Sequence, residues 1–341
     1  MKIKKNLLYI GNKLSKNGNT LSTIESLANK LQEEGFAVNT ASTVQSKPLR
    51  MLDMIMTVFK NRKWADVVLI DTYSTLNFQY AVAVANICGF FKIPYIPILH
   101  GGNLPSRLQK SKKQSKKLFG KAKTNVAPSH YLLEAFKNEG YTNLTYIPNT
   151  IEINNYPFLL RNNIQPKLLW VRSFSKIYNP MLALYVVEVL LKKGHTNTEL
   201  YMVGPDKDGS METCKAYAKQ KNLPVTFTGA LTKQEWIQQS KNYNIFINTT
   251  HVDNTPVSLI EAMALGLPVI STNVGGIPYL LTHDETGLLV PPNSATKFVA
   301  AIEGVLQNQE ETTAMAIKAR KSVEKFDWKE VKKHWILTLQ K

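Results

Sequence analysis

The sequence predicts an α/β protein built from two doubly wound domains, each with a parallel sheet covered by helices. Short apolar runs of strand length alternate with amphipathic helical segments along the whole chain, an order that produces parallel strands joined by right-handed crossovers. A polar stretch with turn residues, at 149–166, interrupts this order near the middle. With 341 residues the chain is long enough for two domains of ordinary size.

The first domain, residues 1–155, is expected to contain six strands. Each is a short run rich in aliphatic residues, and the runs are Leu7–Ile10, Ala37–Thr40, Val67–Ile70, Tyr95–Leu99, Asn125–Ala127 and Leu144–Ile147. An amphipathic helix closed by Gly35 is predicted after the first strand. A second helix before the third strand is predicted from the helical spacing of Leu49, Leu52, Ile55, Met56 and Phe59.

One segment of the first domain is apolar enough to raise the question of a membrane span. Residues 72–91 carry no charge, but the polar residues within the stretch favour a buried helix. The amino-terminal apolar run is too short for a signal peptide, and no small-residue cleavage site follows it.

The second domain, residues 156–325, repeats the alternation. Its predicted strands are Leu168–Val171, Leu200–Val203, Val225–Phe227, Ile245–Ile247 and Val269–Ile270. The last segment, residues 326–341, has the spacing of an amphipathic helix. Ligands of open parallel sheets bind beyond the carboxyl ends of the strands, so residues directly after the predicted strands are the candidate site residues.

The stretch 251–276, HVDNTPVSLIEAMALGLPVISTNVGG, carries the most specific functional signal. It places two carboxylates eight residues apart across a predicted helix start, before a strand and a Gly-Gly turn. Carboxylates accept hydrogen bonds from sugar hydroxyls, and helix-start N–H groups bind phosphate. The stretch therefore predicts a nucleotide-sugar site, with donor contacts from Asp253, Asn254, Thr255, Pro256, Val257, Ser258 and Glu261.

Three further candidates follow predicted strands. Arg172 comes directly after a strand, where a guanidinium can clamp a diphosphate through two parallel hydrogen bonds. His100 ends another strand and can donate to, or accept from, a substrate hydroxyl, although a structural histidine is the plainer interpretation. Gly11 opens a loop, which also contains Gly18, whose backbone can approach a sugar or a phosphate closely.

A metal centre is not expected. The triplet Asp206-Lys207-Asp208 precedes Gly209 and has the composition of a turn, and a hard metal needs more oxygen ligands than two aspartates supply. Cys88 and Cys214 lie far apart and fit no metal-binding spacing.

The stretch 251–276 resembles the donor-site signature of the family 4 retaining glycosyltransferases of GT-B fold. That signature has an acid, seven further residues, Glu-Ala-Met-Ala, Pro-Val-Ile and Val-Gly-Gly. Asp253 stands where the family usually has a glutamate, and Thr255 and Pro256 occupy part of an often glycine-rich loop. The resemblance implies two Rossmann-like domains with a cleft between them, the acceptor in the first and the donor in the second. It also implies that helix 326–341 packs back on the first domain.

The resemblance further implies metal-independent transfer of a hexose-type sugar, with retention of configuration and no cofactor, from a UDP- or GDP-linked donor to a saccharide or lipid-linked acceptor. Glu261 would hold the ribose diol, and the backbone after Gly229, at Ala230 and Leu231, would contact the base. It assigns catalytic roles to His100, Arg172, Lys176 and Asp253.

Lys176 departs from the family pattern. The family places a lysine five or six residues after the arginine, where this chain has Ile177 and Tyr178. Two alternatives follow: either Lys176 binds the leaving phosphate from a shifted position, or Arg172 binds it with helix N–H groups alone. Two other functions stay open: a nucleotide-sugar epimerase of the same architecture, and a non-catalytic subunit that binds nucleotide sugar.

Charge adds a candidate partner. The net charge is +17, and the tract Arg107–Lys123 holds eight basic residues and no acid. Basic clusters gain about 1 kcal/mol per Lys or Arg near an anionic leaflet. We therefore expect a cytoplasmic location with peripheral attachment to the inner face of the membrane. Nucleic acid is not an expected partner, because the tract lacks interleaved aromatic residues and any recognisable binding module.

Overall fold

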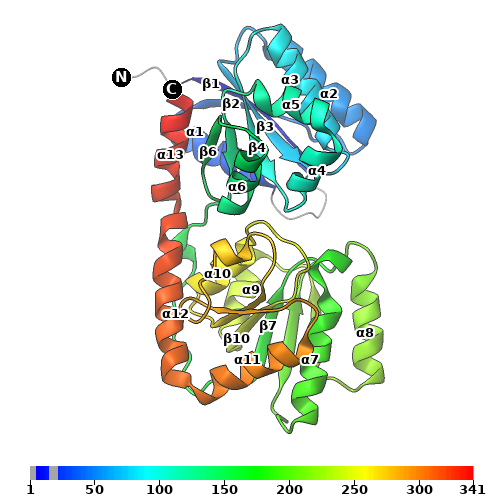
Figure 1. Ribbon diagram of the computed structural model, residues 1–341, viewed down its shortest axis with the longest axis vertical. Helices are drawn as coiled ribbons and strands as arrows, with labels where there is room; N and C mark the ends of the chain where they lie inside the picture. Colours follow the sequence, from blue (N-terminus) through cyan, green and yellow to red (C-terminus); the bar gives the residue numbers. More distant parts are fainter. Residues whose placement is uncertain (1–4, 15–21, 341) are drawn as a thin grey trace. The chain divides into compact units, whose positions relative to one another are not determined.

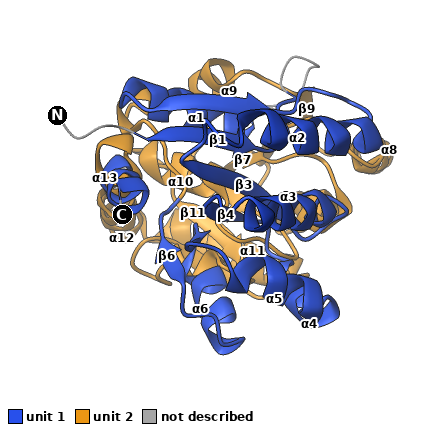
Figure 2. Ribbon diagram, turned by 90° about the horizontal axis from the view of Figure 1, so that it is seen from above, with its two compact units in different colours: residues 1–148, 332–341 blue, residues 149–331 orange. Residues whose placement is uncertain are grey.

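The computed structural model describes residues 5–14 and 22–340, and the chain divides into two compact units (Figure 1). Unit 1 comprises residues 1–148 and 332–341, and unit 2 comprises residues 149–331 (Figure 2). Each unit contains a six-stranded sheet whose neighbouring strands are all parallel. The α/β class and the doubly wound architecture are confirmed.

The sheet of unit 1 has the strand order β2-β1-β3-β4-β5-β6. Its strands are β1 Asn6–Ile10, β2 Ala37–Ala41, β3 Val67–Tyr73, β4 Tyr95–His100, β5 Asn125–Ala127 and β6 Leu144–Tyr146. The helices between them are α1 Thr23–Glu33, α2 Lys47–Asn61, α3 Phe78–Phe90, α4 Leu104–Lys110, α5 Lys112–Gly120 and α6 His130–Asn138. The six strands lie where the apolar runs predicted them.

The uncharged stretch 72–91 contains the end of β3 and the helix α3, which buries one side against the core of unit 1. Across the described part of the chain, no helix combines the length and apolar character that crossing a membrane requires. The expected buried helix is confirmed.

Helix α2 lies where the spacing of apolar residues predicted it, but that spacing marks the exposed side of the helix. Leu49, Leu52 and Met56 are 58%, 55% and 52% exposed. The buried residues of α2 are Arg50, Met54 and Val58.

The sheet of unit 2 has the order β12-β11-β10-β7-β8-β9. Its strands are β7 Lys167–Val171, β8 Glu199–Val203, β9 Val225–Gly229, β10 Ile245–Asn248, β11 Val269–Thr272 and β12 Leu288–Val290. Its helices are α7 Pro180–Lys192, α8 Ser210–Gln220, α9 Lys233–Ser240, α10 Val257–Ala264, α11 Ala295–Gln307 and α12 Gln309–Val323. The five predicted strands are confirmed, and the edge strand β12 was not predicted.

The last helix, α13 Trp328–Gln340, begins in unit 2, and its residues from Lys332 belong to unit 1. The Nζ atom of Lys332 lies 2.9 Å from Oε1 of Glu34, next to the end of α1. Trp335 and Leu339 are buried, so this part of α13 contributes an apolar side to unit 1.

Candidate functional site

The predicted site residues of unit 2 lie around the carboxyl ends of its strands. Arg172 follows β7 directly, Gly229 ends β9, and Asp253 lies in the loop from β10 to α10. In a parallel sheet these strand ends share one edge, which is where such folds bind ligands. Glu261 lies on α10, the helix that follows β10.

Glu261 is a buried carboxylate with one oxygen already engaged. The residue is 5% exposed, and Oε1 accepts hydrogen bonds from the Tyr156 hydroxyl at 2.7 Å and from Lys233 Nζ at 2.6 Å. Oε2 accepts no hydrogen bond from any residue that the structure describes. Burial, and then the negative charge of Glu261, raise the pKa of Tyr156 far above its ordinary value, so Tyr156 stays a donor.

Arg172 and Asp253 form an ion pair. Nη2 of Arg172 donates to Oδ2 of Asp253, and the two side chains are only 15% and 13% exposed. Nε of Arg172 is buried and has no partner among the described residues. The two groups that the sequence assigns to phosphate and to sugar are thus paired with each other.

Tyr178 supports the other side of Arg172. The guanidinium carbon lies 4.1 Å from the centre of the Tyr178 ring, a cation–π distance. Burial lowers the pKa of Arg172, and Tyr178 opposes this shift. Tyr178 occupies one of the positions where the resembled family carries its lysine, so an aromatic ring stands there in place of a second cation.

Glycines let the backbone segments around this ion pair pack closely. A Cβ at Gly204 would overlap the carbonyl oxygen of Arg172, and a Cβ at Gly276 would overlap that of Asn254. A Cβ at Gly275, whose φ is +55°, would overlap the carbonyl oxygen of Asp253. The Gly276 N–H donates to the same Asp253 oxygen at 2.9 Å. The Gly-Gly turn therefore holds the loop that carries Asp253.

The remaining donor-site candidates of unit 2 surround α10 and the end of β9. Pro256 caps α10, so the N–H groups of Val257 and Ser258 begin the helix, and the buried Ser258 hydroxyl has no hydrogen-bond partner among the described residues. The Asn254 N–H donates to Oδ1 of Asp253 at 2.8 Å, and the Thr255 carbonyl accepts from Asn149 at 3.5 Å. Beyond Gly229, Ala230 is exposed and Leu231 is half-buried.

Lys176 lines a cavity that the Arg172–Asp253 pair does not line. It begins a short 3-10 turn, Lys176–Tyr178, and lines a cavity of about 400 Å³ with Asn179, Asp208, Ser210 and His251. Neither Arg172 nor Asp253 lines this cavity.

The acid-rich turn near Lys176 is held by hydrogen bonds. Oδ2 of Asp208 accepts from Ser175 Oγ and the Lys176 N–H at 2.9 Å each. The Ser210 hydroxyl, and then that N–H, hold the pKa of Asp208 at about 2. Oδ1 of Asp206 accepts from the N–H groups of Asp208 and Gly209. Within residues 5–14 and 22–340, no three His, Cys, Asp or Glu side chains gather as a metal site would require.

In unit 1, His100 is held by a buried aspartate. Strands β3 and β4 pair Tyr73 with His100, and Asp71 lies two residues before Tyr73 on β3. Nε2 of His100 lies 2.7 Å from Oδ1 of Asp71, which also accepts from the Tyr9 hydroxyl at 2.8 Å. The Tyr73 ring stacks on the imidazole, with ring centres 4.9 Å apart.

Gly11 lies against the same aspartate. A Cβ at Gly11 would overlap Oδ2 of Asp71, a buried atom with no partner among the described residues. The structure thus gives Gly11 a packing role beside Asp71. Gly18, from the same predicted loop, falls outside the described residues.

The basic tract 107–123 contains α4 and α5. Its lysines at 110, 112, 113, 116, 117 and 121 are exposed. Arg107 is used internally: its Nε donates to the Ser74 carbonyl at 2.8 Å, and its guanidinium lies over Phe78. The lysines, without Arg107, form the charged surface of this tract.

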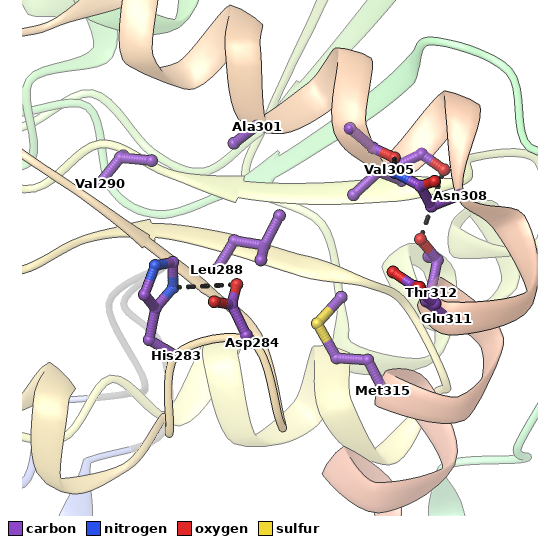
Figure 3. Close-up of a pocket in the computed structure, with 11 residues that line it drawn as sticks. His283, Asp284, Leu288, Val290, Ala301, Val305, Asn308, Glu311, Thr312 and Met315 are labelled. Atoms are coloured by element: carbon purple, nitrogen blue, oxygen red, sulfur yellow. Dashed lines mark hydrogen bonds and ion pairs between the residues drawn. The ribbon is translucent and has the colours of Figure 1, made fainter.

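Figure 3 shows a separate cavity of about 340 Å³ in unit 2, at the sheet edge made by β12. Its lining includes the apolar side chains of Leu288 and Met315 and the polar side chains of His283 and Glu311. None of the predicted site residues lines this cavity.

Comparisons with known proteins show similarity to glycosyltransferases in sequence and in fold. The family model "Glycosyl transferases group 1" matches residues 155–322, which is most of unit 2. Among solved structures, a sucrose-phosphate synthase from Thermosynechococcus elongatus superposes with a TM-score of 0.80 at 16% identity, over 98% of each chain. HepE from Anabaena, in complex with UDP and glucose, gives a TM-score of 0.75 at 15% identity, over 98% of this chain and 99% of HepE. The fold is that of the GT-B glycosyltransferases.

Sequence relatives are similar to this chain over stretches of different length. The sulfoquinovosyl transferase SQD2 of Arabidopsis thaliana is 30% identical over 110 residues, which are 31% of this chain and 22% of SQD2. The amylovoran biosynthesis glycosyltransferase AmsK of Erwinia amylovora is 25% identical over 300 residues, which are 80% of this chain and 69% of AmsK. The chain therefore spans about a fifth of SQD2 and about two thirds of AmsK.

The residues that hold the predicted ones in place were not predicted from the sequence. Tyr156 and Lys233 reach Glu261 from 105 and 28 positions away, and Asp71 reaches His100 from 29 positions away. A carboxylate directly after the apolar run Val67–Ile70 was a usable signal for Asp71. Tyr156 and Lys233 carry no local pattern that marks them.

We predict that Gly276→Ala destabilises unit 2, because the new methyl group would overlap the Asn254 carbonyl. The expected loss is about 2 kcal/mol or more of unfolding free energy, measured by urea denaturation of the whole chain. Gly304→Ala is the matched control, since it lies in α11 and its Cβ would meet nothing within 4 Å. The control should be neutral or gain up to about 1 kcal/mol from helix propensity. Equal stability of the two variants would contradict the packing role of Gly276.

Proposed function

We propose that this chain is a retaining glycosyltransferase that moves a hexose-type sugar from a UDP- or GDP-linked donor to a saccharide or lipid-linked acceptor, without a metal. The observation that carries the proposal is the buried carboxylate of Glu261, fixed through one oxygen beside the carboxyl ends of the strands. It lies within the segment that matches the glycosyltransferase family model. HepE, a protein of the same fold, is bound to UDP and glucose.

Glu261 is suited to a ribose diol. Two neighbouring hydroxyls are paired donors, and a carboxylate accepts both when its orientation is fixed. Tyr156 and Lys233 fix that orientation by holding Oε1, which leaves Oε2 for the ligand. Both bonds are charge-assisted, so each stabilises the buried carboxylate that a neutral environment would disfavour.

Arg172 is the group that would stabilise the leaving diphosphate. Because its Nη2 is held by Asp253, donor binding would exchange that carboxylate for a phosphate oxygen. The exchange keeps one charge-assisted bond on Arg172 throughout and frees Asp253 for hydroxyls of the donor sugar. The N–H groups of Val257 and Ser258, at the start of α10, are further phosphate donors. Lys176 lines a different cavity, so we assign the main contact with the diphosphate to Arg172 and not to Lys176.

His100 would bind a saccharide hydroxyl. When Asp71 is ionised it can only accept, so Nε2 of His100 carries the proton shared with it. Nδ1 is then the atom free to accept from a hydroxyl, or to donate to it when the ring is protonated. Asp71 is therefore a positioning residue for His100.

Exposed lysines in 110–121 support an anionic surface as a partner of unit 1. A peripheral position on the inner face of a membrane would bring the enzyme to a lipid-linked acceptor. AmsK, an amylovoran biosynthesis enzyme, supports an acceptor of the exported-polysaccharide kind.

A non-catalytic nucleotide-sugar binder is the second candidate. One observation favours it: Arg172 and Asp253, the groups assigned to phosphate and to sugar, form an ion pair with each other. Such a protein would bind the nucleotide through Glu261 and leave the sugar bond intact.

Slow hydrolysis of the donor without acceptor separates the two candidates. The chain is incubated with UDP- and GDP-linked hexoses, with and without a chelator, and sugar release is followed by NMR. The enzyme should release the sugar with its donor configuration first, at a rate that the chelator leaves unchanged. Binding without release of sugar from any donor would favour the non-catalytic protein. Inversion, or loss of activity with the chelator, would refute retention or metal independence.

Glu261→Gln should weaken nucleotide binding by about 10- to 150-fold, because a hydrogen bond to a charged group contributes about 1.5–3 kcal/mol. Isothermal titration with the preferred nucleoside diphosphate measures the change. Glu212→Gln, an exposed acid on α8, is the control and should bind as the wild type does. An unchanged affinity of the Glu261 variant would refute the ribose role.

Asp71→Asn should lower the rate of donor hydrolysis about tenfold or more, because it removes the charge that orients His100. Nucleotide affinity should stay unchanged, because Asp71 lies in unit 1 and the residues proposed to bind the nucleotide lie in unit 2. Asp53→Asn, a half-exposed acid on α2, is the control. A parallel loss of rate and nucleotide affinity would indicate a folding defect, and an unchanged rate would refute the positioning role.

A further inference from the structure

Unit 1 has a second concave site at the end of its sheet opposite to His100. A cavity of about 610 Å³ lies where β3 and β4 begin, and its lining includes Val67, Pro94 and Tyr95. Four lysines also line it: Lys5, Lys92, Lys121 and Lys123. We call these four residues the lysine pocket.

The lysine pocket carries positive charge without matching acids. Asp66 is the only acid that lines the cavity among the described residues, and its Oδ2 accepts the Asn6 N–H at 2.7 Å. None of the four lysines forms an ion pair with a described residue. Burial, and then the nearby Lys5, lower the pKa of Lys123. Ammonium groups that disfavour each other's charge are stabilised by an anion placed between them.

An apolar surface continues from the edge of this cavity. Gly89 and Lys92 line the cavity, and between them Phe90 is 79% exposed. The Phe91 ring lies 5.0 Å from that of Phe90 and 5.3 Å from that of Phe59, centre to centre.

Phe59 belongs to an apolar stripe along α2, and α2 lies beside α3 in unit 1 (Figure 2). We define the α2 stripe by its exposed members, Leu49, Leu52, Met56 and Phe59. Their spacing puts them on one side of the helix. A stripe of large exposed apolar side chains of this kind marks an interaction surface.

We propose that the lysine pocket binds the phosphate of an anionic phospholipid and that the α2 stripe enters the apolar part of the same leaflet. The positive charge of the lysine pocket suits a ligand that carries a phosphate. The apolar surface that runs from Lys92 through Phe90 and Phe91 to the α2 stripe suits hydrocarbon attached to that phosphate. The proposal rests on the membrane contact proposed above and names its site and its ligand. It needs none of the residues assigned to sugar transfer.

Vesicle binding tests the lysine pocket. Lys5→Gln/Lys121→Gln/Lys123→Gln should bind vesicles containing phosphatidylglycerol about a hundredfold more weakly than wild type, at about 1 kcal/mol per lysine. Lys92 is not substituted in this variant. Its φ of 57° lies in the left-handed region, so a change there would also act on the backbone conformation. The control, Lys219→Gln/Lys241→Gln/Lys297→Gln, removes three exposed lysines of unit 2. Its affinity for the same vesicles should fall about threefold or less. If the two variants weaken equally, the lysine pocket is not a specific site and the proposal fails.

The α2 stripe is tested separately. Leu52→Gln/Met56→Gln should weaken binding to the same vesicles at least about tenfold, since two apolar side chains no longer enter the leaflet. Ile317→Gln, an exposed apolar residue on α12 of unit 2, is the control and should have no effect. Unchanged binding of the α2 variant would overturn the insertion of α2.

Soluble glycerol phosphate distinguishes the source of the phosphate. It should bind weakly and only when the three lysines are intact, whereas vesicles of the same headgroup bind tightly. Tight glycerol phosphate binding without vesicle binding would identify a soluble anion and overturn the lipid assignment. Nucleoside diphosphate affinity, measured without vesicles, should be equal in all these variants. Failure of vesicle binding with intact nucleotide binding would therefore refute only the membrane site.

Discussion

The close approach of backbone segments at three glycines is the constraint on which the site of unit 2 depends. Gly204 lies against the carbonyl of Arg172, and Gly275 and Gly276 lie against those of Asp253 and Asn254. Without a Cβ at these positions, the segment after β7 comes within hydrogen-bonding distance of the segment after β8, and the segment after β10 does so with the segment after β11. The positions of the guanidinium and the carboxylate are consequences of that packing, so the site is set by backbone geometry before any ligand arrives.

Unit 1 uses the same kind of contact around a different acid. Gly11 lies against the carboxylate of Asp71, which is fully buried and holds both Tyr9 and His100. In each unit a glycine thus makes room for a carboxylate or for the loop that carries one, near the ends of the strands. The electrostatic consequences differ, because the unit 2 acid Asp253 is paired with a cation, whereas Asp71 is held by neutral donors and an imidazole.

Much of the fold could be predicted from the sequence, because each strand is a local apolar run and each crossover helix has a local period. The edge strand β12 was missed because its three residues, Leu288–Val290, are too few to show a pattern. The side of α2 that faces the core was not predictable, because Arg50 turns inward to the carbonyls of Val44 and Gln45 while the apolar residues turn outward. Of the candidate site, the sequence indicated Arg172, Asp253 and Glu261, but not the Arg172–Asp253 pair or the donors to Glu261, since these contacts join residues far apart in the chain.

The most direct test of this account is a crystal structure of the chain bound to its preferred nucleoside diphosphate. We predict that Oε2 of Glu261 accepts from the ribose hydroxyls, that Tyr156 and Lys233 remain on Oε1, and that Arg172 leaves Asp253 for a phosphate oxygen. An intact Arg172–Asp253 pair, with the ribose hydroxyls bound away from Glu261, would contradict the account.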